Sequence, residues 1–384
     1  MSGPIPPRAP HVALNALYLD PGVSGGTETY LHGLAPALRA ARPDAPLTVV
    51  TTRRGGAALH AAGWSSWARV VVLRCDEGQR ARRQAAEQVA LGRTARRLGV
   101  DLVHSLANVG PIRLRGAAHV VTLHDVNYFH HATFGAITTR GLRAVVPAVA
   151  RHADALITGS AVAREDVCAT LDLDPARFTV VPHGIDGRAP VAPSPEAGVR
   201  ARLDLPPGAR VVLTVGAKRP HKNQEVLVRA LGALPPDVHL VLAGHPEEYD
   251  LVLRALAAEL GVADRVRFPD YVSDADLAAL WRLCAVAAFP TRAEGFGLPL
   301  AEALAAGVPV AASDLPVLRE VGGGFPRYFD PDRPEDAAAA IGALLEDPPD
   351  PAPGRAWAAR FTWAAAARAT WDVYDRTLAH GGRR

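Results

Sequence analysis

The segment TRAEGFGLPLAEALAAGVPVAASDLPVLREV, residues 291–321, carries the strongest fold signal in this chain. It continues from the apolar run AVAAFPT (285–291) and contains a second run, VPVAAS (308–313). A helical pattern lies between the two runs, and Pro299 marks its start because proline suits the first turn of a helix. Strand, helix and strand in this order predict a βαβ unit with parallel strands.

Two carboxylates frame the start of this expected helix, which we place near Leu298. Glu294 lies in the preceding loop and Glu302 in the first turn or two of the helix. The backbone N–H groups at a helix start, next to Gly295 and Gly297, form a ready anion pocket. Carboxylates on both sides of such a pocket suit a ligand with hydroxyls on both sides of a diphosphate. A nucleotide sugar has this shape.

The same alternation of short apolar runs and longer helical patterns extends over the whole chain, which predicts an α/β fold with parallel sheets. The expected strands are 11–19, 47–52, 69–74, 102–105, 119–124, 155–160, 178–184, 209–216, 238–244, 265–272, 285–291 and 308–313.

The alternation is interrupted once, by the segment GRAPVAPSPEAG at 187–198, which is rich in Pro, Ala and Gly. We therefore predict two tandem Rossmann-like domains that face each other across a cleft: residues 1–186, a linker over 187–207, and residues 208–361. A final helix over 362–380 could pack back on the first domain.

Six motifs in order resemble those of the family-4 retaining glycosyltransferases, which have the GT-B fold. The motifs are SGGTETY (24–30), VVTLHDV (120–126), TGSAVAREDV (158–167), VVPHGID (180–186), VGAKRPHKN (215–223) and the E-x7-E segment at 294–302. His183 stands where Asn is common in the family. The resemblance covers nearly the whole chain and implies transfer of a hexosyl group from a nucleoside-diphosphate sugar, on the donor side of the second domain, to an acceptor hydroxyl on the side of the first.

The resemblance also implies roles for individual residues. It implies that Glu294 binds the hydroxyls of the donor sugar, that Glu302 binds the ribose, and that His124 lies beside the donor sugar at the reacting centre. The expected catalytic residues are Glu294, His124 and Lys222. The expected donor-binding residues are Gly25, Gly26, Lys218, Arg219, Lys222, Gly295, Phe296, Gly297, Leu298 and Glu302. For His124, a buried structural histidine at a strand end is an equally simple interpretation of the residue alone.

The loop GAKRPHKNQ (216–224) contains the only two lysines among 42 basic residues, Lys218 and Lys222. Lysine is a compact point charge that can meet a phosphate oxygen in a tight loop. The resemblance assigns this contact to Lys222, and Lys218 and Arg219 compete for a second one. Charge that builds on the departing phosphate would be stabilised here, so we expect a metal-independent site without a cofactor.

Composition excludes several other classes of protein. The chain has 384 residues, is 49% hydrophobic and has a net charge of +3, which does not indicate a nucleic-acid partner. Its three cysteines, Cys75, Cys168 and Cys284, form neither a disulfide framework nor a zinc motif. Because no signal peptide or transmembrane run is evident, we expect a cytoplasmic protein.

The donor base and the acceptor are not determined by the sequence. Base recognition is expected around 270–272, and acceptor recognition in loops 106–118 and 127–140. A glycan, a lipid carrier and a small natural product all remain open as acceptors. The arginine-rich helix over 79–99 could touch an anionic membrane, but a solvated helix face is the preferred interpretation because aromatic residues are absent. The alternative functions are a nucleotide-sugar-binding partner without catalysis and an epimerase of the same fold.

Overall fold

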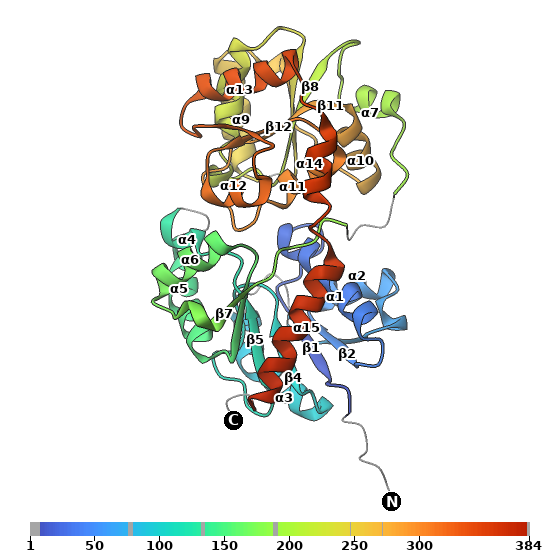
Figure 1. Cartoon of the computed structure of the whole chain (residues 1–384), viewed down its shortest axis with the longest axis vertical. Coiled ribbons are helices and arrows are strands. Elements are labelled where there is room, and N and C mark those ends of the chain that lie inside the picture. Colours follow the sequence, from blue (N-terminus) through green and yellow to red (C-terminus); the bar gives the residue numbers. More distant parts are fainter. Residues whose placement is uncertain are drawn as a thin grey trace, which may run out of the picture.

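The computed structural model describes residues 8–75, 80–131, 135–186, 191–245, 247–270 and 272–381. Within these residues the chain forms two α/β domains, each built on a parallel sheet (Figure 1). The predicted α/β architecture with two Rossmann-like domains is therefore confirmed.

The first sheet has the strand order β3-β2-β1-β4-β5-β6-β7. Its strands are β1 (Val12–Ala16), β2 (Leu47–Thr51), β3 (Arg69–Val72), β4 (Leu102–Ser105), β5 (Ala118–Thr122), β6 (Ala155–Thr158) and β7 (Phe178–Val180). Its helices are α1 (Gly26–Ala41), α2 (Arg53–Ala61), α3 (Arg80–Leu98), α4 (Asn127–His130), α5 (Ala136–His152) and α6 (Ala161–Leu171).

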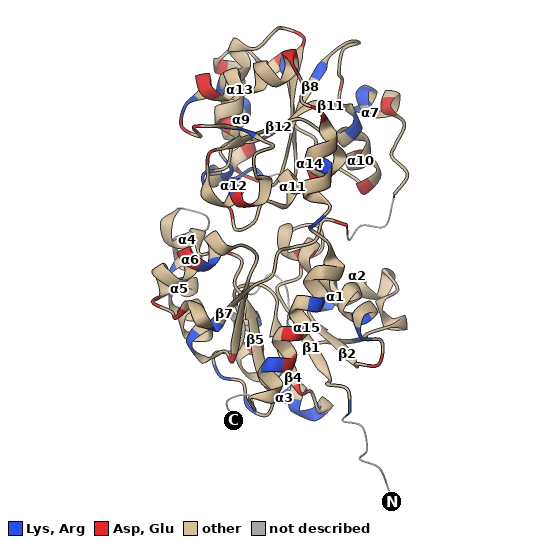
Figure 2. Ribbon diagram, viewed as in Figure 1, with Lys and Arg blue, Asp and Glu red and all other residues tan. Residues whose placement is uncertain are grey.

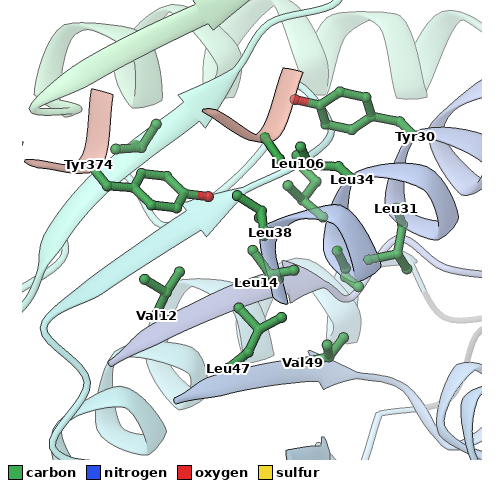
Figure 3. Close-up of a cluster of buried hydrophobic side chains, with 14 of the residues drawn as sticks. Val12, Leu14, Tyr30, Leu31, Leu34, Leu38, Leu47, Val49, Leu106 and Tyr374 are labelled. Carbon is green, nitrogen blue, oxygen red and sulfur yellow. The ribbon is translucent and has the colours of Figure 1, made fainter. Parts of the chain in front are cut away.

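Strand β1 shows why the strands appear as unbroken apolar runs. Val12 and Leu14 belong to the core cluster beneath α1, whereas Ala13 belongs to the cluster beneath α3. Both faces of the sheet are covered, so successive residues are all buried instead of alternating with polar ones. Figure 3 shows the cluster on the α1 side of the sheet, around Leu14 and Leu38.

The second sheet has the strand order β10-β9-β8-β11-β12-β13. Its strands are β8 (Arg210–Val215), β9 (Val238–Ala243), β10 (Val266–Arg267), β11 (Cys284–Phe289), β12 (Val310–Ser313) and β13 (Arg327–Phe329). Its helices are α7 (Glu196–Arg202), α8 (Gln224–Ala230), α9 (Tyr249–Glu259), α10 (Asp274–Leu283), α11 (Leu298–Ala306), α12 (Pro316–Gly322), α13 (Pro334–Glu346) and α14 (Pro351–Ala358).

Two features of the second domain differ from the sequence-based prediction. The edge strand β13 was not predicted, because its three residues form no apolar run and Arg327 is exposed. The predicted linker at 187–207 contains α7, which packs against α10 and places Val199 in the core of the second domain. That part of the predicted linker therefore belongs to the second domain, and residues 187–190 lie outside the described residues.

The last helix, α15 (Trp363–Ala379), returns to the first domain and packs along α1 (Figure 1). The indole N–H of Trp371 donates to the carbonyl of Leu38 at 3.1 Å, and Arg42 forms an ion pair with Asp375. Tyr374 is fully buried in the same cluster (Figure 3).

Where α15 begins, the two connections between the domains are bonded to each other. The N–H of Ile185 donates to the carbonyl of Phe361 at 3.0 Å, and the N–H of Trp363 donates to Asp186 Oδ1 at 2.7 Å. These bonds hold the crossing point of the chain between the two domains.

Candidate functional site

Helix α11 begins at Leu298, as the sequence predicts. Gly297 precedes it with φ at 93°, in the left-handed region that favours glycine. A Cβ at this position would lie 2.9 Å from Cδ2 of Leu318, so the turn has little room for a side chain. The positive end of the α11 dipole therefore lies next to the loop that contains Glu294.

The structure brings Lys222 and Glu294 together from two different loops. The Lys222 ammonium forms an ion pair with Glu294 Oε2, and the two side chains are 27% and 21% exposed. Lys222 follows β8 and Glu294 follows β11, two neighbouring central strands of the second sheet. Both line a small cavity of about 30 Å³ together with Gly297, at the carboxyl ends of the strands where α/β sheets bind ligands.

Lys218 lies in a different environment, which corrects its predicted role. Its side chain is fully buried, Nζ donates to the carbonyl of Gly244 at 2.8 Å, and Nζ lies 3.5 Å from Asp250 Oδ2. Burial is the largest influence on this ammonium and lowers its pKa, while Asp250 raises it. A phosphate cannot reach Lys218 in this conformation, so the residue stabilises the loop instead of contacting the donor.

Arg219 keeps its candidacy for the second phosphate contact. Its guanidinium is partly exposed and forms an ion pair with Glu247 at 2.7 Å. An exposed ion pair is worth little and exchanges partners readily, so an anionic ligand can compete with Glu247.

A larger cavity of about 620 Å³ separates the two domains. Its first-domain wall includes Gly25 and Glu28 at the start of α1, and its second-domain wall includes Gly244 and Glu302. Gly26 is the first residue of α1. Apart from the adjoining backbone, no heavy atom of the described residues lies within 4 Å of the Cβ position of Gly25 or Gly26, so this helix start leaves room for a ligand. The cavity has the size of a small-molecule site.

The region expected to read the nucleobase also faces this cavity. Asp270 and Val272 line it, while Tyr271 lies outside the described residues.

The two domains approach each other closely at Gly295. A Cβ at this position would lie 2.4 Å from the carbonyl oxygen of His124, so the loop can approach β5 only with glycine here. The Ser160 hydroxyl donates to the carbonyl of Gly295 at 3.0 Å. Phe296 is buried against His183 and Phe361, so its side chain serves packing.

His124 follows β5 and its carbonyl oxygen lies close to Gly295 of the second domain, and both nitrogens of its ring are engaged. Nε2 is 2.8 Å from the carbonyl oxygen of Leu106, and Nδ1 is 3.2 Å from Nε2 of His183. Burial lowers the pKa of His124 to about 4, so the ring is neutral near pH 7. The ring therefore has no spare N–H for a donor sugar in this conformation.

Asp125 is a residue of the site to which the sequence analysis gave no role. Burial, and to a smaller extent the nearby Glu294, raises the pKa of its carboxyl to about 6, against the lowering effects of the Asn127 N–H and of Lys222. The backbone N–H of Asn127 donates to its Oδ1 at 3.0 Å. Its position directly after His124 at a strand end was the available signal, but the sequence does not show that Asp125 faces the Lys222–Glu294 pair.

Of the two predicted acceptor loops, loop 106–118 is hydrogen-bonded to a side chain of α3. The Gln88 side chain donates to the carbonyl of Gly110 at 2.8 Å and accepts from the N–H of Ile112 at 2.8 Å. Loop 127–140 forms α4 and the start of α5, and its residues 132–134 lie outside the described residues.

Acidic and basic residues are scattered over both domains in Figure 2. In the arginine-rich segment at 79–99, residue 79 and the side chains of Arg80 and Arg82 lie outside the described residues, and Arg93, Arg96 and Arg97 are exposed. Among the described helices, none is both long and apolar enough to cross a membrane.

Both halves of the chain match models of known families. Residues 24–187 match the model described as Glycosyltransferase Family 4, and residues 198–357 match the model described as Glycosyl transferases group 1.

Curated relatives agree with these matches. A D-inositol 3-phosphate glycosyltransferase of Mycolicibacterium gilvum is 37% identical over 243 residues, 60% of this chain and 54% of that protein. One from Streptomyces griseus is 33% identical over 322 residues, 76% of this chain and 65% of that protein. The chain thus spans about half to two thirds of the length of these relatives.

Solved structures share the fold along nearly the whole chain. Sucrose-phosphate synthase from Thermosynechococcus elongatus has a TM-score of 0.74 at 22% identity and covers 97% of this chain and 100% of its own. Anabaena HepE in complex with UDP and glucose has a TM-score of 0.75 at 20% identity and covers 95% and 100%.

Proposed function

The chain belongs to the family-4 glycosyltransferases of the GT-B fold, and from this premise we propose that it moves a hexosyl group from a nucleoside-diphosphate sugar to an acceptor hydroxyl with retention of configuration. The observation that supports the proposal most directly is the Lys222–Glu294 ion pair at the start of α11. Its two charges match the two halves of such a donor, an anionic diphosphate and a sugar rich in hydroxyls.

Donor binding would exchange the partners of this pair. The diphosphate would take the Lys222 ammonium, and Glu294 would then accept hydrogen bonds from sugar hydroxyls. Glu302 lines the wall of the interdomain cavity and would receive the ribose. The helix start at Gly25 would approach the diphosphate from the first domain.

The same groups can stabilise the transition state. The bond from the anomeric carbon to the β-phosphate oxygen breaks while the acceptor oxygen bonds to the anomeric carbon on the same face. The acceptor proton passes to the departing phosphate. Negative charge grows on that phosphate, and a fixed ammonium and a helix N-terminus stabilise it with little reorganisation.

The relatives supply the first substrates to test. HepE was solved with UDP-glucose, and the curated relatives are named for D-inositol 3-phosphate. A thermal-shift screen of UDP, GDP and dTDP should show one nucleotide that raises the melting temperature most, because a ligand that binds only the folded state stabilises it. The matching sugar donor is then assayed with D-inositol 3-phosphate and other hydroxyl acceptors. We expect activity to persist in EDTA.

Substitutions test the site itself. Glu294→Ala and Lys222→Ala should each lower kcat/KM by about 10²-fold or more, since each removes a charged contact to the reacting groups. Asp237→Ala breaks an exposed ion pair with Arg210 and serves as the matched control with normal turnover. Lys218→Met should lower the melting temperature, because it leaves the Asp250 carboxylate buried without its ammonium. Near-normal rates in both Glu294→Ala and Lys222→Ala would overturn the site.

The configuration of the product separates the alternatives. Slow hydrolysis of the donor to a free sugar with retained configuration supports the transferase. A binding partner without catalysis would leave the donor intact, and an epimerase would change the configuration within the sugar.

A further inference from the structure

Asn223 directly follows Lys222 and has an unusual backbone conformation. It is 0% exposed, and its φ of 55° and ψ of 33° lie in the left-handed region. Few residues with a side chain adopt this region, and asparagine tolerates it better than most. The 3₁₀ turn Pro220–Lys222 ends here, and α8 begins with the next residue. The backbone therefore changes direction immediately after Lys222.

The side-chain amide of Asn223 is bonded to two other strand ends. Nδ2 donates to the carbonyl of Pro290 at 3.1 Å and to the carbonyl of Pro331 at 2.7 Å. Pro290 directly follows β11, and Pro331 lies two residues beyond β13. Because a carbonyl oxygen can only accept, these contacts fix the orientation of the amide and use both of its N–H groups. One buried amide thus joins the loop after β8 to the ends of β11 and β13.

These bonds bear on the site because Lys222 and Glu294 lie on two of the loops that Asn223 joins. The bond to the end of β11 holds the backbone on the far side of Lys222. On its near side, the carbonyl of His221 accepts the N–H of Arg292 from the Glu294 loop at 2.8 Å. The ammonium therefore reaches Glu294 and the small cavity from a backbone that is held on both sides.

We propose that Asn223 is a positioning residue of the donor site: its amide holds the backbone after Lys222 so that the ammonium stays aligned with Glu294 and with the donor diphosphate. A cation that is already in place stabilises a developing negative charge with little reorganisation. The inference rests on the proposed function for the diphosphate, whereas the alignment of the ion pair does not depend on it.

Asn223→Gly tests the amide without disturbing the turn. Glycine adopts a positive φ readily, so the left-handed backbone is retained while both bonds of the amide are lost. The variant also removes Oδ1, a buried acceptor without a partner among the described residues.

The first measurement reads the ion pair without any ligand, since the chain contains only two lysines. With ¹³C-labelled lysine, Lys222→Ala assigns the two Cε signals. In Asn223→Gly the Lys222 signal should move toward its position in Glu294→Ala, whereas the signal of the buried Lys218 should not move. An unchanged Lys222 signal overturns the proposal.

Calorimetry separates positioning from general stability. With the nucleoside diphosphate that gives the largest thermal shift, Asn223→Gly should bind about tenfold more weakly, because a misaligned ammonium loses much of a charge-assisted bond. The corresponding nucleoside lacks both phosphates and should bind as it does to the natural protein. Equal weakening of both ligands is the outcome for a residue that only stabilises the fold, and it contradicts the proposal.

Turnover in a double-mutant cycle tests whether Asn223 acts through its neighbour. Asn223→Gly alone should lower kcat/KM at least about tenfold, because a small misplacement of a group at the reacting centre is costly. In the Lys222→Ala background the same substitution should have almost no further effect, because the group that it positions is already gone. Losses that multiply independently would overturn the positioning role.

Two further variants complete the test. Asp204 in the same domain also has a positive φ, of 48°, but its side chain is 98% exposed, so Asp204→Gly is the matched control and should change none of these measurements. Asn223→Asp keeps the size of the side chain but lacks the amide N–H groups, and it should behave like Asn223→Gly. If neither Asn223 variant folds, the residue serves the fold and the proposal fails. If the natural protein binds no nucleoside diphosphate, the proposed function fails while the lysine signals still decide the alignment.

Discussion

At the scale of single residues, Lys218 and Lys222 are only four positions apart but lie in different environments. Lys222 faces a cavity at the strand ends and balances Glu294. Lys218 is buried in the second domain, where its ammonium lies close to the Asp250 carboxylate and donates to the carbonyl of Gly244. An ammonium can serve either purpose, and only its surroundings decide which.

Buried histidines determine a second property at this scale, the response to acid. Burial lowers the pKa of His104 to about 3 and of His119 and His124 to about 4, from an ordinary value of 6.5. Below pH 6.5 these histidines therefore bind protons in the unfolded chain, whereas in the folded chain they bind them only near pH 4 or lower. Stability is fully present above pH 6.5 and falls as the pH drops, by at most about 1.4 kcal/mol per pH unit for each histidine.

We expect urea unfolding at pH 7.5, 6.0 and 5.0 to show this loss of stability. Asp125, whose pKa burial raises to about 6, acts in the opposite sense below that pH, so single substitutions isolate the histidine effect. His119→Asn should flatten the pH profile whatever its absolute stability, while the exposed His152→Gln should not. Parallel profiles for His119→Asn and the natural protein would contradict the argument.

At the scale of elements, helix α15 is held to α1 by the fit of one indole against two glycines. A Cβ at Gly33 would lie 2.0 Å from Cε2 of Trp363, and one at Gly184 would lie 2.2 Å from the backbone nitrogen of Trp363. The absence of side chains at these two positions lets α15 begin where the two domain connections cross.

Gly33→Ala should therefore destabilise the protein by about 1–3 kcal/mol, because a packed core resists an added carbon. Gly141→Ala is the matched control on α5. Outside the helix backbone, no heavy atom in the part of the chain that the structure describes lies within 4 Å of its Cβ position, and alanine should stabilise that helix by up to about 1 kcal/mol. Urea midpoints measure both. Equal midpoints for the two variants would show that Trp363 does not constrain the helix pair.

At the scale of the whole molecule, a carboxylate of the second domain caps a helix of the first. Glu320 on α12 accepts the N–H of Ala161 at 2.8 Å through Oε1 and the N–H of Val162 at 2.9 Å through Oε2. The negative charge lies at the positive end of α6. This contact, together with the bond from Ser160 to Gly295, joins the domains beside the site.

Glu320→Ala should weaken domain closure by about 1 kcal/mol, the usual effect of losing a helix cap. Hydrogen exchange at the Ala161 and Val162 amides should become faster, and small-angle scattering should show a more open particle without donor. Glu335→Ala, in the exposed first turn of α13, removes a comparable charge within one domain and should change neither measurement. Unchanged exchange at α6 in Glu320→Ala would exclude the capping role.

Hydrophobic periodicity and local motifs were sufficient to predict the two sheets except for the edge strand β13, the start of α11 and the assignment to a family. Both properties depend on neighbouring residues in one segment, so they are visible in the sequence. The motif order also singled out Lys222 and Glu294, which the structure joins although they come from different loops.

Three features depended on contacts between distant segments. The burial of Lys218, the bond between His124 and His183, and the cap from Glu320 to α6 join residues 26 to 159 positions apart. No periodicity encodes such pairs, because they form only when loops at the strand ends meet and the two domains close. The sequence by itself thus determined the architecture and the candidate donor site, while the tertiary structure decided which charged and aromatic side chains face that site and which hold it in place.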